Sequence, residues 1–397
     1  MLPIFYSYND TGAPTLNNAA GSLISVLDAC LVSGFNSRTV TNLAVAANVC
    51  TATTNVAHGY TVGQRVSVAG AANPVLNGDK TILSVPIPTT FTYAAVTPDA
   101  NEAPGAGSVK RTPLGWVKEF TDTNKAVYKM TDGAAYGIRL RVEDTAALTT
   151  AARVIGVESP TSVDLYADAF PTQAQLAGGG YWSKGANTAA AKVWHLIGDE
   201  RFFYLLVENS ANVAFNPLDP IFYGGAFGDI SSYKVGEGYA TILIASDTGG
   251  SSGGFPVVLK DSLGGTPSTS NNARYIARQH TGVLKSIRVG MIGVGSGGGS
   301  TYMSSSSSNV YPSPVDNGLI FAEPVFVSET LAGANHPVRG TMPGLLEILA
   351  RYTDLMTTPT IVTATDGSGL KALVLRGVAS TNGGNGAIAL KMSSPWR

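Results

Sequence analysis

The sequence holds four histidines, the residues that most often carry acid–base or metal chemistry near neutral pH, and their spacing favours neither role. His58 precedes a glycine and is predicted to be a turn residue. His195 alternates with Trp194 in a predicted strand and is expected to pack, while His280 and His336 are expected to be loop residues, and no other residue stands at a spacing typical of a catalytic or metal-binding partner. No HExxH pattern, and no other arrangement typical of a zinc enzyme, is present.

Two glycine-rich motifs resemble catalytic or nucleotide-binding signatures only in part. Ser296 lies in "GVGSGGGS", where it follows a glycine directly and so departs from the Gly-x-Ser-x-Gly of a nucleophile elbow. Gly293, Gly295 and Gly298 match Gly-x-Gly-x-x-Gly, but "GGSTYMSSSSS" follows where a dinucleotide site needs a helix. We therefore predict no catalytic residue, no cofactor and no metal ion.

Paired carboxylates are the remaining route to catalysis, since glycan-degrading enzymes use two of them across a cleft. Neighbours on a strand point to opposite faces, so adjacent acids make poor pairs. We expect solvated turn charges at the acids considered, which are Glu143, Asp144, Asp199, Glu200, Asp229 and Glu237.

Aromatic side chains beside glycines offer a possible sugar-binding platform. The segments "GGGYWSKG" and "IFYGGAFG" and the neighbouring "SSYKVG" supply Tyr181, Trp182, Tyr223 and Tyr233 as candidate contacts to a glycan or partner. The alternative is that these rings pack at strand ends, which aromatic side chains do more often.

The composition favours a subunit of an assembly. Of the 397 residues 44% are hydrophobic, which is enough to form cores, but only 13% are charged. A surface with so few ions stays soluble most readily when much of it is buried against neighbours. An ordinary secreted β protein of low charge is the alternative.

Charge and cysteine content argue against other classes of protein. The 26 basic and 27 acidic residues nearly balance, so we do not expect nucleic acid as a partner. Cys30 and Cys50 are too few for a disulfide framework or a thiolate metal site. No signal peptide and no membrane-spanning segment is expected from the sequence.

The pattern of apolar residues predicts a mainly β chain with two or three short helices. Helical spacing recurs after Asn17 and ends at Gly34, and a second short helix is expected after Pro343. A helical turn is considered for "DAFPTQAQL". The clearest hairpins are "WVKEF" with "KAVYKM" and the two arms of "KVWHLIGDERFFYLLVEN", which meet at a Gly-Asp turn.

The predicted organisation is a discontinuous parent domain interrupted by an insertion. Residues 1–37 and 113–245 form a parent domain resembling a β-sandwich or barrel, 38–112 an inserted small β module, and 246–397 a Gly/Ser-rich looped β region. Within the module, "RVSVAG" and "KTILSV" read as strands joined by a tight Asn77-Gly78 turn, and "TPDANEAPGAGSVKRTP" as a connector.

Two resemblances to known families bear on function. "SLISVLDACLVSGF", "GWVKEFTDTNKAVYK" and "RGTMPGLLEIL" resemble stretches of uncharacterised structural proteins of tailed bacteriophages. The segment 58–93 resembles a small β module found in phage tail and fibre proteins, at His58, Gly59, Val62, Gly63, Val66, Val68, Gly70, Asn77, Gly78, Thr90, Phe91 and Tyr93.

These resemblances imply a non-enzymatic component of a tailed-phage virion, made in the host cytoplasm and placed in the tail tip or baseplate. Its expected partners are further copies of itself around a cyclic axis and other phage tail proteins. The alternatives are a host-surface glycan-binding protein, a capsid decoration protein and, more weakly, a depolymerase.

Overall fold

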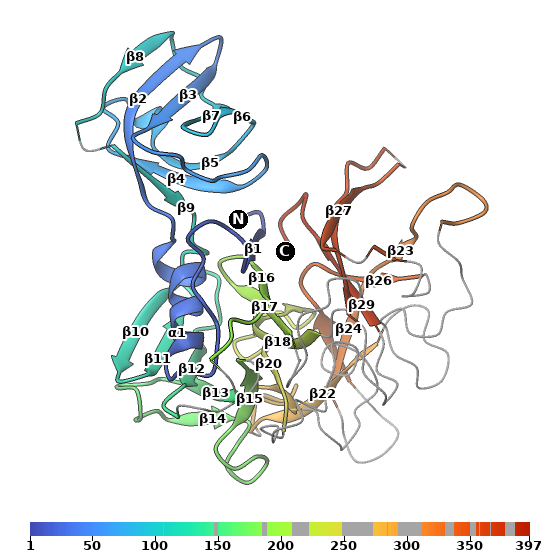
Figure 1. Cartoon of the computed structure of the whole chain (residues 1–397). Helices are drawn as coiled ribbons and strands as arrows, with labels where there is room; N and C mark the ends of the chain where they lie inside the picture. The colour runs from blue at the N-terminus through green and yellow to red at the C-terminus, as the bar shows by residue number, and fades with distance from the viewer. Residues whose placement is uncertain are drawn as a thin grey trace. The chain divides into compact units, whose positions relative to one another are not determined.

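A computed structural model describes most of the chain (Figure 1). The described residues are 1–105, 107–146, 150–184, 189–208, 222–247, 273–283, 285–292, 312–329, 337–349, 355–356, 358–365, 367–377 and 386–397. Ser296, the glycines around it and His336 lie outside them.

The chain divides into two compact units. The larger holds Met1–Pro3, Leu16–Ile24 and Val117–Arg397, and the smaller holds Ile4–Thr15 and Ser25–Trp116. The predicted inserted module, 38–112, lies within the smaller unit, together with the chain on either side of it.

The smaller unit contains one curled antiparallel sheet (Figure 1), whose described strands follow the order β5-β4-β9-β2-β3-β7-β6, with β8 paired to β2. Its strands are β2 (Arg38–Ala46), β3 (Val49–Thr54), β4 (Arg65–Ala69), β5 (Gly78–Thr81), β6 (Ser84–Ile87), β7 (Thr90–Ala94), β8 (Ala100–Glu102) and β9 (Ser108–Arg111). β1 (Ile4–Ser7) precedes it.

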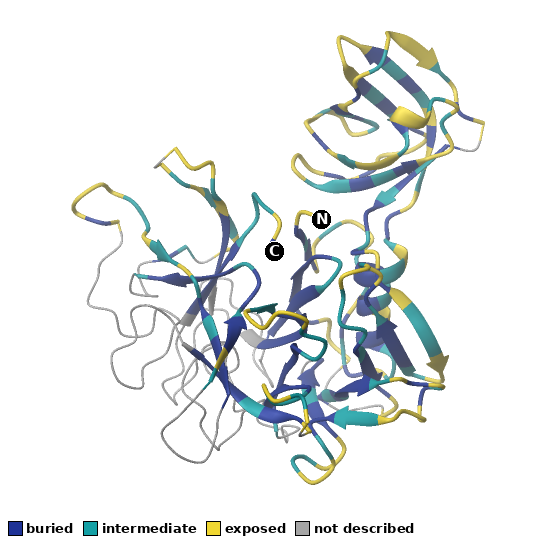
Figure 2. Cartoon of the chain, turned by 180° about the vertical axis from the view of Figure 1, so that it is seen from behind, coloured by how far each residue is buried: buried dark blue, intermediate teal, exposed yellow. Residues whose placement is uncertain are grey.

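The module has a core of its own, because its strands alternate between buried and exposed residues (Figure 2). That core includes Val40, Leu43, Val66, Phe91 and Tyr93. The first and last strands of the module, β2 and β9, are paired, with Arg38 opposite Val109. The two points at which the module joins the rest of the chain are therefore neighbours.

Two details of the module differ from the sequence predictions. Asn77 has φ −83° and ends a short 3₁₀ helix, η2 (Pro74–Leu76), so the tight Asn77-Gly78 turn is wrong. The Asn77 side chain instead bonds the backbone of Ala71 in both directions. The predicted connector contains strands β8 and β9. Glu102 of β8 pairs with Leu43 of β2, and Val109 of β9 pairs with Val68 of β4.

The first helix is confirmed but is shorter than predicted, and its second half is wound more loosely, as a π-helix. α1 (Ser22–Leu27) continues as the π-helix η1 (Asp28–Ser33) and stops at Gly34, whose φ of +71° favours glycine. The Asp144 carboxylate accepts the backbone N–H of Leu23, which satisfies one of the free donors at the helix start.

In the larger unit, one antiparallel sheet has the order β10-β11-β12-β13-β14, with β15 also paired to β13. Its strands are β10 (Val117–Asp122), β11 (Lys125–Lys129), β12 (Arg139–Glu143), β13 (Ala151–Glu158), β14 (Asp168–Phe170) and β15 (Gly180–Ser183). The β10–β11 hairpin confirms one of the predicted hairpins. The "DAFPTQAQL" segment contains a helical turn, closed by the Leu176 N–H on the Thr172 carbonyl.

A second sheet of the larger unit has the order β16-β17-β18-β20-β21-β22-β24-β25-β19. The strands are β16 (Trp194–Gly198), β17 (Phe202–Glu208), β18 (Phe222–Asp229), β19 (Ser231–Ser232), β20 (Thr241–Ala245), β21 (Ala273–Ile276), β22 (Ile287–Ile292), β24 (Phe326–Glu329) and β25 (Val338–Thr341). The predicted β16–β17 hairpin is confirmed, and every residue of both strands is buried.

A third sheet of this unit shows where helical spacing misleads. Its order is β23-β26-β29-β28-β27, with β23 (Phe321–Ala322), β26 (Leu345–Ile348), β27 (Thr360–Thr363), β28 (Lys371–Gly377) and β29 (Gly386–Lys391). The helix predicted after Pro343 is wrong. Leu345 and Leu346 pair with Leu390 and Ala389, and a run of buried apolar residues fits a two-sided strand as well as a helix.

The fold class is therefore mainly β, as predicted. The described strand pairs are antiparallel, and the described helical segments are short connections between strands.

Candidate functional site

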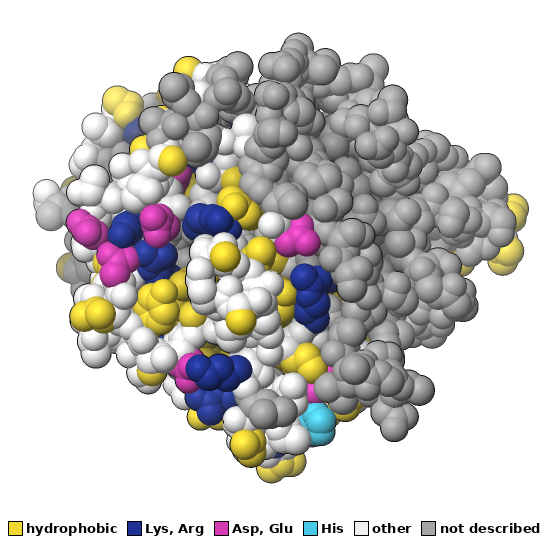
Figure 3. Space-filling model, turned by 90° about the horizontal axis from the view of Figure 1, so that it is seen from below, with side chains coloured by type: hydrophobic (Ala, Val, Ile, Leu, Met, Phe, Trp, Pro, Cys, Tyr) yellow, Lys and Arg dark blue, Asp and Glu magenta, His cyan; other side chains and the backbone are white. Residues whose placement is uncertain are grey.

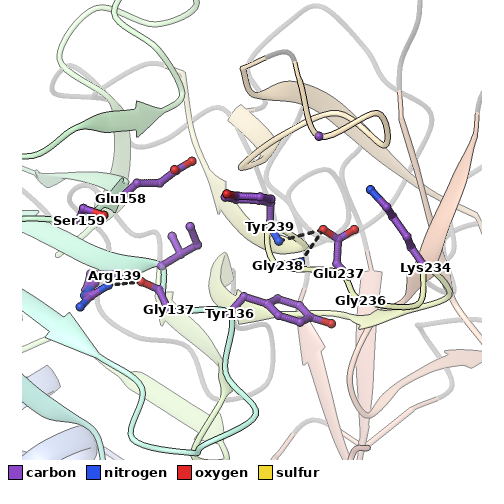
Figure 4. A pocket seen from close by; sticks show the side chains of 12 residues that line it. Tyr136, Gly137, Arg139, Glu158, Ser159, Lys234, Gly236, Glu237, Gly238 and Tyr239 are labelled. Carbon is purple, nitrogen blue, oxygen red and sulfur yellow. Dashed lines mark hydrogen bonds between the residues drawn. The ribbon is translucent and has the colours of Figure 1, made fainter.

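A polar pocket of about 470 Å³ lies in the larger unit (Figure 4). Its size falls in the range of small-ligand sites. It is lined by Tyr136, Gly137, Ile138, Arg139, Glu158, Ser159, Lys234, Gly236, Glu237, Gly238, Tyr239 and Gly282.

Four short segments between strands bring these residues together, and one of them, between β21 and β22, contributes only Gly282. The first leads into β12, the second follows the end of β13 at Glu158, and the third is the 234–239 loop before β20. Two features hold these segments in place. The Asp229 carboxylate accepts the Tyr136 N–H at 2.9 Å, and Ser159 turns the chain with φ +46°. In Figure 4, Glu158 and Lys234 stand on opposite sides of Tyr239 and Glu237.

Glu158 is held by a two-point ion pair. Arg278 Nε and Nη2 lie 3.0 and 2.6 Å from its two carboxylate oxygens, a geometry that fixes both side chains. The same guanidinium lies 4.1 Å from the centre of the Tyr239 ring, within cation–π range. Glu158, Arg278 and Tyr239 thus form one preorganised wall.

Glu237 is held by a buried network of charges. Its carboxylate accepts the backbone N–H groups of Gly238 and Tyr239 and a 2.6 Å bond from Arg339 Nη2. Burial raises the pKa of Glu237, but the Arg339 hydrogen bond and the backbone bonds outweigh it, so its pKa is lowered overall. The carboxylate is therefore ionised at neutral pH.

The network continues beyond the pocket. Arg339 also pairs with Glu329, which is fully buried, and His280 Nδ1 lies 2.8 Å from the other Glu329 oxygen. His280 is a loop residue, as predicted, and no sequence spacing indicates its contact with Glu329, because β24 places that glutamate beside a loop 49 positions away. These contacts help to hold the Glu237 carboxylate in place.

The arrangement is suited to holding a ligand rather than to proton transfer. Glu158 and Glu237 both accept hydrogen bonds from arginines, and Arg139 is occupied by Glu119 at 2.9 Å. Lys234, an exposed residue, donates to the His280 carbonyl. The pocket is thus a rigid concave surface that carries hydrogen-bond donors, hydrogen-bond acceptors and two tyrosine rings.

The four aromatic candidates do not share one surface. Tyr181 and Trp182 are consecutive in β15, and Tyr181 packs against the Arg153 guanidinium, 3.6 Å from its ring centre. Trp182 is 1% exposed and donates its indole N–H to the Ile244 carbonyl. Tyr233 is 59% exposed, and the Tyr223 side chain lies outside the described residues.

Two of the other histidines pack within the protein. His58 is buried, accepts the Tyr60 backbone N–H on Nδ1 and stacks on the Tyr60 ring, so it holds the module together rather than merely turning the chain. His195 is buried in β16, and burial lowers its pKa to about 3. The prediction that His195 packs within a strand is confirmed.

Several predicted turn acids are buried ion-pair partners instead of solvated charges. Asp144 lies 2.5 Å from Lys184 Nζ with both side chains fully buried, Asp199 pairs with Arg397 at 2.9 Å, and Asp229 pairs with Arg201 at 3.1 Å. Sequence reasoning missed this because each partner lies at least 28 positions away, so no local spacing reveals it.

Local sequence patterns carry little signal for the pocket as well. Of its lining residues only Glu237 was considered as a candidate. A weak signal was available in "EGY" at 237–239, where glycine-flanked polar and aromatic residues follow a strand.

In the described part of the chain, surface charge, metal-ligand clusters and membrane-spanning helices indicate no further site. Figure 3 shows basic and acidic side chains interspersed over the described part of one face. Over the described ranges, no cluster of three His, Cys, Asp or Glu residues could hold a metal ion, and no helix is long and apolar enough to cross a membrane.

Comparisons with known proteins assign no family. No family model and no curated protein sequence matches the chain. Among solved structures the chain is weakly similar to the phage phi92 endosialidase, at 10% sequence identity and a TM-score of 0.17. The match covers 90% of this chain and 52% of that one, so the chain spans about half the length of that protein. A likeness at this score carries no argument about activity.

Proposed function

We propose that the chain is a non-enzymatic structural component of a tailed-phage virion, located in the tail tip or baseplate. It acts through contacts with copies of itself around a cyclic axis and with other tail proteins. The proposal rests on the motif resemblances, the low charge of the chain and the surface of the β module.

The observation that carries the assembly role is an apolar rim on the module, formed by Val56, Val62, Leu83 and Ile87. These side chains are 51%, 63%, 49% and 54% exposed. The Gly63 N–H binds the Ile82 carbonyl, which brings Val62 and Leu83 together. A cluster of exposed branched side chains on a well-packed module is typical of a contact surface.

Backbone bonds complete the rim. The Thr54 and His58 N–H groups bind the Thr89 and Pro88 carbonyls, which places Val56 beside the end of β6. Burying a fully exposed side chain of this kind contributes roughly 1.5–3 kcal/mol, and about half of that remains to be gained at each of these half-exposed residues.

A non-enzymatic role is supported by the pocket, whose carboxylates are both tied in arginine pairs. Incubation with host polysaccharide should release no reducing ends. Release that depends on Glu158 or Glu237 would contradict this part of the proposal and favour a depolymerase.

The assembly role is tested by substitution on the rim. Val62→Lys should lower the mass of the particle measured by light scattering, because a lysine charge cannot be buried there without cost. The matched control is Val315→Lys, at a valine that is 92% exposed and lies outside the module. An oligomer that survives Val62→Lys and Leu83→Lys together would exclude the rim as the contact.

A further inference from the structure

We propose that the pocket lined by Tyr136, Glu158, Glu237 and Tyr239 binds an uncharged saccharide. This goes beyond the assembly role and does not depend on it. It also differs from a surface platform built on Tyr181 or Tyr233, neither of which lines the pocket.

The balance of charge favours an uncharged ligand. The lining contributes two cations, Arg139 and Lys234, and two carboxylates, Glu158 and Glu237. Three of these four side chains are already neutralised by ion pairs with Glu119, Arg278 and Arg339. An anionic ligand would face two carboxylates, and a cationic one would face guanidinium groups, so charge complementarity selects neither.

The hydrogen-bonding groups suit a polyhydroxylated molecule. A carboxylate oxygen has more than one lone pair, so Glu158, whose side chain is 13% exposed, can accept a ligand hydroxyl proton while keeping its Arg278 bonds. Lys234 and the Ser159 hydroxyl supply donors on the exposed side. A sugar hydroxyl is both donor and acceptor and so can use both kinds of group.

The tyrosines provide the apolar part of the site. Tyr136 and Tyr239 are half-buried, and each has an arginine against its ring, at 5.5 and 4.1 Å. The C–H face of a pyranose ring packs on such aromatic surfaces. A lipid chain would need a mostly apolar lining, which this pocket lacks.

Rigidity makes the site suitable for binding. Glu158 is fixed by Arg278 at two points, and the turn at Glu237 is fixed by its own carboxylate on two backbone N–H groups. Because these side chains are already ordered, a ligand does not have to order them, and less free energy is lost on binding.

The test uses the full-length protein and defined trisaccharides in isothermal titration. The uncharged probes are maltotriose, a β-1,4-linked galactose trimer and a β-1,4-linked N-acetylglucosamine trimer. The charged probes are trigalacturonic acid and a glucosamine trimer. We expect binding of at least one uncharged probe at up to millimolar concentration, and no binding of the charged ones.

A blocking variant locates the site. Gly238→Trp should abolish binding, because a Cβ at Gly238 meets no atom within 4 Å and its φ is not left-handed, so the indole can occupy the pocket without disturbing the fold. Gly133→Trp is the matched control, since that glycine is equally open and does not line the pocket. Both variants should keep the wild-type melting temperature.

Tyr239→Ala should weaken binding about tenfold, and Tyr239→Phe should restore most of it, since the ring rather than the hydroxyl carries the contact. Failure of every uncharged probe, binding of only a charged probe, or binding unaffected by Gly238→Trp would overturn the proposal. None of these results concerns the particle mass, so the assembly role is judged separately.

Discussion

At the scale of single residues, the described chain places ionisable groups in its interior and pairs them there. Lys184 and Asp144 lie 2.5 Å apart with no exposed surface, and Lys184 Nζ also donates to the Ala19 and Ala146 carbonyls. Burial raises the pKa of Asp144, and Lys184 opposes that rise. Breaking such a pair leaves an uncompensated buried charge, which costs far more than the pair itself contributes.

Asp144→Ala should therefore destabilise the larger unit by about 3–5 kcal/mol, measured by urea unfolding. It strands the Lys184 ammonium and removes the acceptor for the Leu23 N–H. The double variant Asp144→Leu with Lys184→Met should recover much of that loss. Equal losses in the single and double variants would contradict the stranded-charge explanation.

Trp182→Ala should reduce stability rather than glycan recognition. The indole is buried and packs edge-on against Phe203 at 5.7 Å, so its removal leaves a cavity costing roughly 3–5 kcal/mol. Tyr233→Ala, at an exposed ring, should leave the melting temperature unchanged. A Trp182→Ala protein that melts like wild type would show that the ring is not a core residue.

Buried histidines should make both units less stable in mild acid. Burial lowers the pKa of His58, in the module, and lowers that of His195 to about 3. Each therefore binds a proton more readily in the unfolded chain than in the folded one, so its contribution to stability is present above about pH 6.5 and is lost as pH falls.

For His195 the loss between neutral pH and pH 5.5 is about 1.4 kcal/mol, read from chemical denaturation at each pH. His195→Gln should flatten this part of the profile. His58→Asn keeps an acceptor for the Tyr60 N–H and should flatten the module's transition. A wild-type profile that is flat from pH 7.5 to about 5.5 would contradict the account.

At the scale of elements, sequence patterns were reliable where a short local turn joins two consecutive strands. The β10–β11 and β16–β17 hairpins follow from alternating or apolar arms around short polar turns. The leucines of β26 could not be assigned, because buried runs lack a period and their partner β29 lies more than 40 residues away. Likewise the pocket needs Arg278 beside Glu158, a contact across 120 positions that no local pattern encodes.

The module's boundaries can be tested by excision. Deleting Thr39–Val109 and joining Arg38 to Lys110 by a short Gly/Ser linker should leave a folded remainder, because Arg38 and Val109 are paired neighbours. Far-ultraviolet circular dichroism and a cooperative melt would show this. An unfolded product would count against an independently inserted module.

The informative control is the wider deletion Arg38–Thr112. It also removes Arg111, which donates to the Phe5 carbonyl and the Asp10 carboxylate, and the Thr112 carbonyl that accepts the Tyr6 hydroxyl. We expect the wider deletion to be the less stable of the two. The reverse order would show that these contacts contribute little.

At the scale of the whole molecule, low charge and exposed apolar groups fit a chain whose surface is completed by neighbours. Only 13% of residues are charged, and the charges of the described part are largely committed to ion pairs within the chain. Surface contact between subunits would then depend on apolar groups and backbone hydrogen bonds, which salt screens little. The assembly should accordingly persist at high ionic strength.

The particle mass in solution tests the central claim most directly. Light scattering on the purified full-length chain, coupled to size-exclusion chromatography, should give a whole-number multiple of 40.9 kDa that is stable on dilution and in high salt. Mass spectrometry of purified virions of the encoding phage should detect the chain. A strictly monomeric protein that is also absent from virions would contradict the account.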